Sequence, residues 1–75
     1  MIAKLMVREV GQREFVQHNG DYLDLKPDDM PRVSAIECAA AEGERLCEEG
    51  NVEAFQVWQL VSTKQRVWKL EEVAA

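Results

Sequence analysis

The amino-acid sequence predicts an α+β fold with the element order β-β-β-α-β-β, in which one helix packs on one face of an antiparallel sheet of four to five strands. Three observations lead to this prediction. Apolar and polar residues alternate in several short segments, which is typical of strands. Apolar residues recur at helical spacing in one central segment. The chain has 75 residues, a length that accommodates one domain, which we expect to span residues 1–75.

The first part of the chain contains three predicted strands. Residues 2–9 alternate between the two faces of a strand, with basic side chains on the wetter face. Residues 14–18 form a second strand. Asn19-Gly20 then predicts a type I′ hairpin turn, because both residues tolerate a positive φ. Residues 22–25 would return from this turn as a third strand.

The central segment predicts a helix with a recognisable start and end. Ser34 is its expected N-cap and Glu37 reaches back to complete a capping box, with Pro31 in the first turn as an alternative start. Gly50-Asn51 ends the helix. The predicted buried stripe is made mostly of small residues, which favours a close approach to the sheet: Ile36, Ala39, Ala40, Gly43, Leu46 and Cys47. Residues 53–63 and 66–73 are the last two predicted strands.

The composition indicates a globular domain with an acidic balance. The net charge is −5 and the pI is about 4.8. Because phosphate groups repel an acidic chain, the net charge disfavours nonspecific nucleic-acid binding and binding to anionic membranes, and a local basic patch stays open as an alternative. No run of 18 apolar residues occurs, and the charge at Lys4 comes too early for a signal peptide. We therefore expect a cytoplasmic protein without a transmembrane helix.

The residues that could carry chemistry do not form a catalytic pattern. Cys38 and Cys47 lie on opposite faces of the predicted helix, about 13.5 Å apart along its axis. A disulfide needs Cα atoms within about 7 Å, so we expect two free thiols. His18 is the single histidine and lies at the predicted hairpin. We therefore expect no enzymatic activity, no metal site and no cofactor.

An acidic helix face is the first candidate binding surface. Its members are the glutamates Glu37, Glu44, Glu48 and Glu49. One interpretation is an ordinary solvated helix face. The other is a surface for a basic protein partner, because like charges at helical spacing and glutamates near a helix C-terminus both destabilise a helix.

An apolar sheet face is the second candidate. Its members are Trp58, Leu60, Trp68 and Leu70. If the helix covers Phe55 and Val57, this group lies on the open side of the sheet, where it would suit a partner or a homodimer. If the faces are reversed, the tryptophans pack beneath the helix as core.

Residues 39–46, followed by residues 55–61, resemble a helix-to-strand pattern of small phage- and prophage-encoded proteins. The helical part reads Ala-Ala-Ala-Glu-Gly-Glu-Arg-Leu and the strand reads Phe-Gln-Val-Trp-Gln-Leu-Val. Most of these proteins have no assigned function. Some are anti-CRISPR or other anti-defence inhibitors that occupy a nucleic-acid-binding surface. The resemblance implies a protein partner in the cytoplasm of a host cell, and it identifies no site residues.

Together these features predict a non-enzymatic protein-binding inhibitor or adaptor that docks its acidic helix face on a nucleic-acid-handling target. The alternative is a homo-oligomeric structural or accessory protein that uses the apolar sheet face. A third interpretation is a nucleic-acid binder, which the net charge disfavours. It would use the basic residues on and near the strands: Lys4, Arg8, Arg13, Lys64, Arg66 and Lys69.

Overall fold

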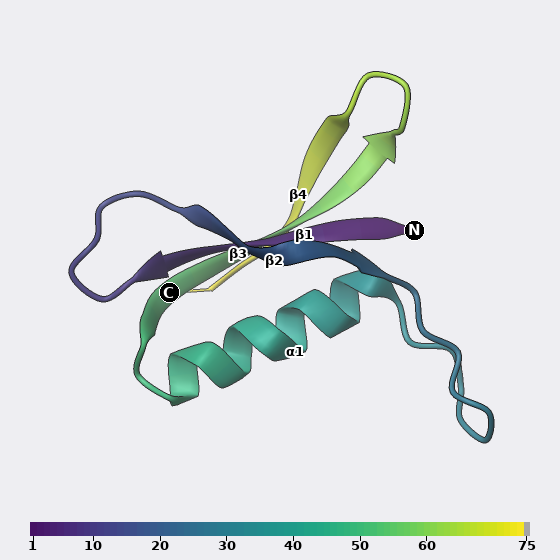
Figure 1. Ribbon diagram of the computed structural model, residues 1–75, viewed down its shortest axis with the longest axis horizontal. Helices are drawn as coiled ribbons and strands as arrows, with labels where there is room; N and C mark the ends of the chain where they lie inside the picture. The colour runs from purple at the N-terminus through teal and green to yellow at the C-terminus, as the bar shows by residue number, and fades with distance from the viewer. Residues whose placement is uncertain (75) are drawn as a thin grey trace.

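A computed structural model describes residues 1–74 and confirms the α+β fold, with one helix packed on a four-stranded antiparallel sheet. The elements are β1 (Ile2–Glu9), β2 (Val16–Leu23), α1 (Ala35–Glu48), β3 (Val52–Ser62) and β4 (Val67–Ala74). The strand order is β2-β1-β3-β4, and all neighbours are antiparallel. Helix α1 lies across one face of the sheet, while the tip of the β3–β4 hairpin rises on the other side (Figure 1). We call this other side the open face.

The prediction of a hairpin at Asn19-Gly20 is wrong, because both residues lie inside the single strand β2. Asn19 has the expected positive φ of 60°, but Gly20 does not. A type I′ turn needs a positive φ at both positions. The chain instead forms an irregularity in the β1–β2 register and continues along β1, so that Tyr22 pairs with Ala3. The predicted second and third strands are therefore one strand, and the sheet has four strands.

The predicted ends of the helix are confirmed. The Ser34 hydroxyl accepts a hydrogen bond from the Glu37 N–H at 3.2 Å, and the Glu37 carboxylate accepts one from the Ser34 N–H at 3.1 Å. This is the capping box. At the other end Gly50 has a φ of 84° and donates to the Cys47 carbonyl at 3.1 Å. The positive φ is the reason for glycine here.

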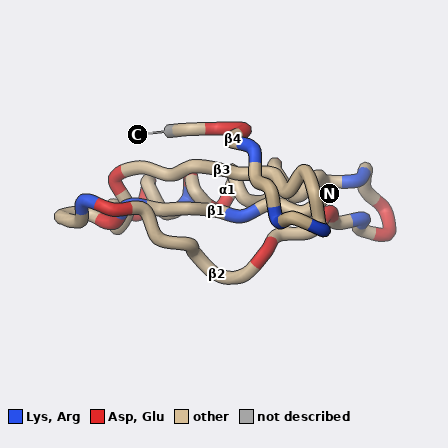
Figure 2. Tube along the Cα trace, turned by 90° about the horizontal axis from the view of Figure 1, so that it is seen from above, with Lys and Arg blue, Asp and Glu red and all other residues tan. Residues whose placement is uncertain are grey.

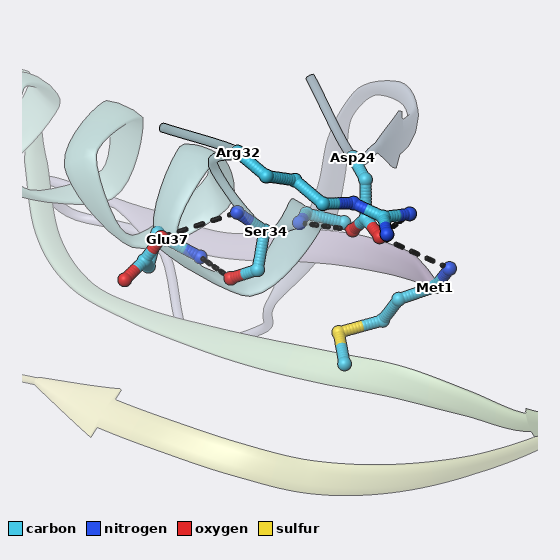
Figure 3. Close-up of polar contacts among 6 residues, drawn as sticks. Met1, Asp24, Arg32, Ser34 and Glu37 are labelled. Carbon is cyan, nitrogen blue, oxygen red and sulfur yellow. Dashed lines mark hydrogen bonds and ion pairs between the residues drawn. The ribbon is translucent and has the colours of Figure 1, made fainter. Parts of the chain in front are cut away.

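Asp24 fixes the helix N-terminus to the start of the sheet (Figure 3). Its carboxylate accepts the Ala35 N–H at 2.8 Å and the Arg32 guanidinium at 3.0 Å. The terminal ammonium of Met1 lies 3.5 Å from the same carboxylate. The hydrogen bond from Ala35 is the main reason why the pKa of Asp24 lies below its usual range.

The hydrophobic core lies between α1 and the face of the sheet that carries Phe55 and Val57. Its buried members alternate along β1 and β3 and recur at helical spacing along α1, as the two periodicities require. They are Ala3, Leu5, Val7, Ala35, Ala39, Leu46, Val52, Phe55 and Val57. The interpretation in which the tryptophans pack beneath the helix is therefore wrong.

Candidate binding surfaces

Three glutamates form a stripe along the solvent side of α1, directly opposite its buried residues. We call Glu37, Glu44 and Glu48 the acidic stripe; all three are exposed. At 100° per residue they point away from the helix side that carries Ala39 and Gly43, which are buried against the sheet. Of the four glutamates predicted to form the acidic face, Glu49 lies outside this stripe, about 100° around the helix from Glu48.

Arg45 separates the acidic stripe from the other helix glutamates. Its guanidinium donates hydrogen bonds to both Glu42 and Glu49, which flank it at helical spacing. These bonds raise the pKa of Arg45, mainly through Glu42. Glu44 and Glu48 form no ion pair within residues 1–74. Their charges are therefore more available to a partner than that of Glu49.

The apolar group predicted from the sequence lies on the open face. In the β3–β4 register Trp58 pairs with Leu70, and Leu60 pairs with Trp68. Leu60 is only 8% exposed, while Leu70 is 40% exposed. Both indole rings are half-buried. Side chains of the open face thus cover one another in part, so that only some of its apolar surface is exposed to solvent.

The basic side chain of Lys4 lies close to both tryptophans, a placement that the alternation of residues along the strands does not predict. The Lys4 Nζ is 4.5 Å from the centre of the Trp68 ring and 5.9 Å from that of Trp58. The Arg66 guanidinium also stacks on Trp68, at 5.2 Å. These are cation–π distances. The Trp58 indole N–H donates to the Gln56 side chain at 3.1 Å, which fixes the orientation of that ring.

The β3–β4 hairpin bends across the open face. Arg66, beside the hairpin tip, lies 3.8 Å from Asp21 of β2, although β2 and β4 are opposite edges of the sheet. Register shifts near Trp58 and between Leu60 and Ser62 mark bulges in this hairpin, and bulges increase local twist. The bend therefore brings the tip of the hairpin over the face that carries Lys4.

The open face carries basic side chains, whereas the helix layer behind the sheet carries the acidic stripe. Figure 2 looks onto the sheet, with basic positions in blue on β1 and on the β3–β4 hairpin. At the far end of β1 the Arg8 guanidinium lies 5.9 Å from the Phe15 ring and bonds Glu53 at 2.7 Å. The acidic stripe lies on the opposite side of the molecule, on α1. The protein therefore has one acidic side and one side that combines aromatic and basic groups.

The residues considered for chemistry lie on two elements, the cysteines on α1 and His18 on β2. Cys38 and Cys47 are half-buried free thiols on α1. His18 lies within β2 rather than at a turn, 4.0 Å from the Glu42 carboxylate. In the part of the chain that the structure describes, no group of three or more histidine, cysteine or acidic side chains is placed to hold a metal ion.

Comparisons with known proteins gave no match to any family model, any curated protein or any solved structure. Among residues 1–74, no helix combines the length and apolar character needed to cross a membrane.

Proposed function

We propose that this chain is a non-enzymatic protein-binding inhibitor or adaptor whose acidic stripe docks on a basic surface of its partner. One observation carries the proposal. Glu44 and Glu48 are exposed on the side of α1 directly opposite the buried residues, and within the described chain neither has a basic partner of its own.

The energetic balance supports a binding role for these two side chains. Like charges four residues apart on a helix cost about 0.2–0.5 kcal/mol. A carboxylate in the last helical turn also faces the negative end of the helix dipole, which typically costs about 0.3–1 kcal/mol. Glu48 incurs both costs. Arg45 offsets the charges of Glu42 and Glu49 instead, so the unfavourable charges are concentrated in the acidic stripe.

The chemistry of the stripe defines the partner class. A row of carboxylates on a rigid helix complements a row of lysine or arginine side chains and increases the rate of encounter with them. Surfaces of that kind are typical of proteins that bind nucleic acid. A protein of this design would inhibit such a target by occupying its nucleic-acid-binding surface. The resemblance to phage-encoded inhibitors agrees with this, and it would place the protein in the cytoplasm of a host cell.

The test is a charge reversal with a matched control. Glu44→Lys together with Glu48→Lys changes the net charge by +4, from −5 to −1, and leaves Glu37 in its capping box. The control, Asp28→Lys with Asp29→Lys, makes the same change in an exposed loop. Wild-type protein captures the partner from cell lysate, and mass spectrometry identifies it.

We expect the helix double variant to lose that partner and the loop double variant to retain it. Binding by wild type should also weaken as salt rises, because the Debye length falls to about 8 Å at physiological ionic strength. Equal capture by both double variants would show that the acidic stripe is an ordinary solvated surface.

The second candidate function is a homo-oligomeric structural or accessory protein. The observation in its favour is the exposure of apolar residues on the open face, including Leu70 and Val73. The position of Lys4 weighs against it. A two-fold interface centred on the tryptophans would remove the Lys4 ammonium from water, close to its own symmetry copy.

A further inference from the structure

We propose that the open face of the sheet binds single-stranded nucleic acid, with Trp58 and Trp68 stacking on bases while Lys4 and Arg66 contact phosphates. This function is separate from the proposed role of the acidic stripe, and it uses the opposite side of the molecule (Figures 1 and 2).

Two aromatic rings and two cations lie together on the open face. Trp58 and Trp68 come from the adjacent strands β3 and β4 and share one face of the sheet. The single Lys4 ammonium lies within cation–π distance of both rings, 5.9 Å from the centre of Trp58 and 4.5 Å from that of Trp68. Aromatic rings on a sheet surface, interleaved with basic side chains, form the type of platform on which single strands stack.

A base stacked on an indole ring is held more strongly than the cation that now covers it. An exposed cation–π pair changes an equilibrium by roughly 2- to 5-fold. A base stacked on an aromatic ring contributes roughly 5- to 150-fold. Bases can therefore displace the Lys4 ammonium from both rings and the Arg66 guanidinium from Trp68. The displaced cations are then free to meet phosphates.

The acidic charge of the protein is not concentrated on the open face. The net charge of −5 disfavours nucleic acid as an average over the whole surface, but the acidic stripe lies on α1, beyond the sheet. Layers packed face to face are about 10 Å apart, and the Debye length at physiological salt is about 8 Å. Salt therefore screens much of the repulsion between the acidic stripe and a phosphate on the open face. The carboxylates of Asp21 and Glu53 are paired with Arg66 and Arg8. Lys4 has no ion-pair partner among residues 1–74.

The same geometry favours a single strand over other occupants. Bases in a duplex are stacked on one another and offer no free face to an indole ring. In a two-fold dimer through this face, a second copy would bring its own Lys4 ammonium, rather than an anion, close to the first. A single strand supplies both the ring that covers the indole and the anion that pairs with the ammonium.

A second basic side chain of β1, Arg8, lies on the open face beyond the tryptophans. Lys4 and Arg8 are on the same face of β1, four residues apart, which at about 3.3 Å per residue separates them by about 13 Å. The Arg8 guanidinium lies 5.9 Å from the centre of the Phe15 ring, which repeats the pairing of a cation with a ring. The charge of Arg8 is already paired with Glu53, so, of the residues that the structure describes, Lys4 is the free cation of β1 on this face.

The test is a titration of the intrinsic tryptophan fluorescence with 12-nucleotide oligothymidine and, in a separate arm, oligouridine. We expect quenching at low salt, with an affinity that falls as salt increases. Preference for one oligomer would distinguish DNA from RNA. Duplex of the same length is the competitor, and it should not displace the single strand.

Variants identify the face. Trp58→Leu should weaken binding by about tenfold, whereas Trp58→Phe, which keeps a ring, should retain most of it. Lys4→Gln should weaken binding and reduce the salt slope by about one. Its matched control is Lys69→Gln: Lys69 pairs with Gln59, which lies opposite the core residue Ala3, so it points to the other face of the same hairpin.

Circular dichroism establishes that each variant is folded before its affinity is compared. The proposal is overturned if wild type shows no quenching by either oligomer, or if Lys4→Gln and Lys69→Gln weaken binding equally. The open face would instead belong to a second copy if the molecular mass were twice that of one chain and the tryptophan fluorescence changed with protein concentration but not with added oligonucleotide. None of these outcomes alters the test of the acidic stripe, which uses helix variants and a protein partner.

Discussion

The ring of Phe55 packs directly on the backbone of Gly43, at the centre of the contact between α1 and β3. A Cβ atom built on Gly43 would lie 2.6 Å from both Cγ and Cδ2 of that ring. Atoms in protein interiors do not approach so closely. Phe55 is 1% exposed, so its ring is enclosed and has no space into which it could retreat. This pair sets how closely the helix approaches the sheet.

The substitution Gly43→Ala should therefore destabilise the protein. Alanine is the better helix former by about 0.8–1.0 kcal/mol, but an extra methyl group in a closely packed core typically costs about 1–3 kcal/mol. We expect a net loss of about 1 kcal/mol in the free energy of unfolding, measured by urea titration. Ala41→Gly, at an exposed position of the same helix, isolates the propensity contribution and should cost about 1 kcal/mol. An increase in stability for Gly43→Ala would show that the helix can move away from the sheet.

A second prediction concerns acid. The pKa of Asp24 is lowered, first by the hydrogen bond from Ala35 and also by the nearby charges of Arg32 and the N-terminus. A carboxylate with a lowered pKa in the folded state contributes stability that is fully present above its unfolded pKa of about 3.9. That contribution is lost as the pH falls through the lower folded pKa.

Asp24→Asn should therefore lower the melting temperature at pH 7, and the gap between wild type and variant should narrow below about pH 4. Thermal melts at pH 7 and at pH 2.5 measure this gap. Asp28→Asn is the control, because Asp28 is exposed in the loop before α1 and should leave both melts unchanged. A gap that is as wide in acid as at neutrality would mean that Asp24 acts by shape rather than by charge.

The helix was predictable because its determinants are local. Ser34 and Glu37 satisfy each other's backbone groups within one turn, and Gly50 supplies the positive φ at the end. The strands before the helix were less predictable. Asn19-Gly20 has the composition of a hairpin turn, but the pairing of Tyr22 with Ala3 competes with that turn and prevails. Such pairing depends on the opposite strand, which local composition does not contain.

The two candidate surfaces differ in the same way. The acidic stripe follows from helical spacing alone, so the sequence was sufficient to place Glu44 and Glu48 on one side. The placement of Lys4 between two tryptophans requires the pairing of β1 with β3, in which Lys4 lies opposite Trp58, and the bend of β4 over the face. Neither the register nor the bend can be read from the spacing of residues in one strand.

A third prediction concerns self-association. Because a dimer through the open face would enclose the Lys4 ammonium, we expect a monomer of 8.6 kDa by light scattering up to high protein concentration. Trp58→Ser should leave that mass unchanged. If wild type were instead dimeric and Trp58→Ser monomeric while still folded, the homo-oligomeric function would be the correct one.

The last prediction separates stability from function at one residue. Glu48→Lys removes the repulsion between Glu48 and Glu44, introduces a favourable pair four residues apart on the helix, and places a cation near the negative end of the helix dipole. These effects contribute about 0.2–0.5, 0.2–0.5 and 0.3–1 kcal/mol respectively. Their sum is about 1 kcal/mol, which raises the melting temperature of a domain of this size by several degrees. Glu48 is exposed, so no core contact opposes the gain.

A solvated helix face and a docking surface predict different consequences for Glu48→Lys. Both predict the higher melting temperature, which differential scanning calorimetry measures. Only a docking surface predicts that the more stable protein captures less of its partner, since an ammonium group would then face the basic side of that partner. A more stable variant that binds as well as wild type would leave glutamate at this position without a functional reason. Weaker binding combined with greater stability is the trade-off expected where a side chain is retained for recognition rather than for folding.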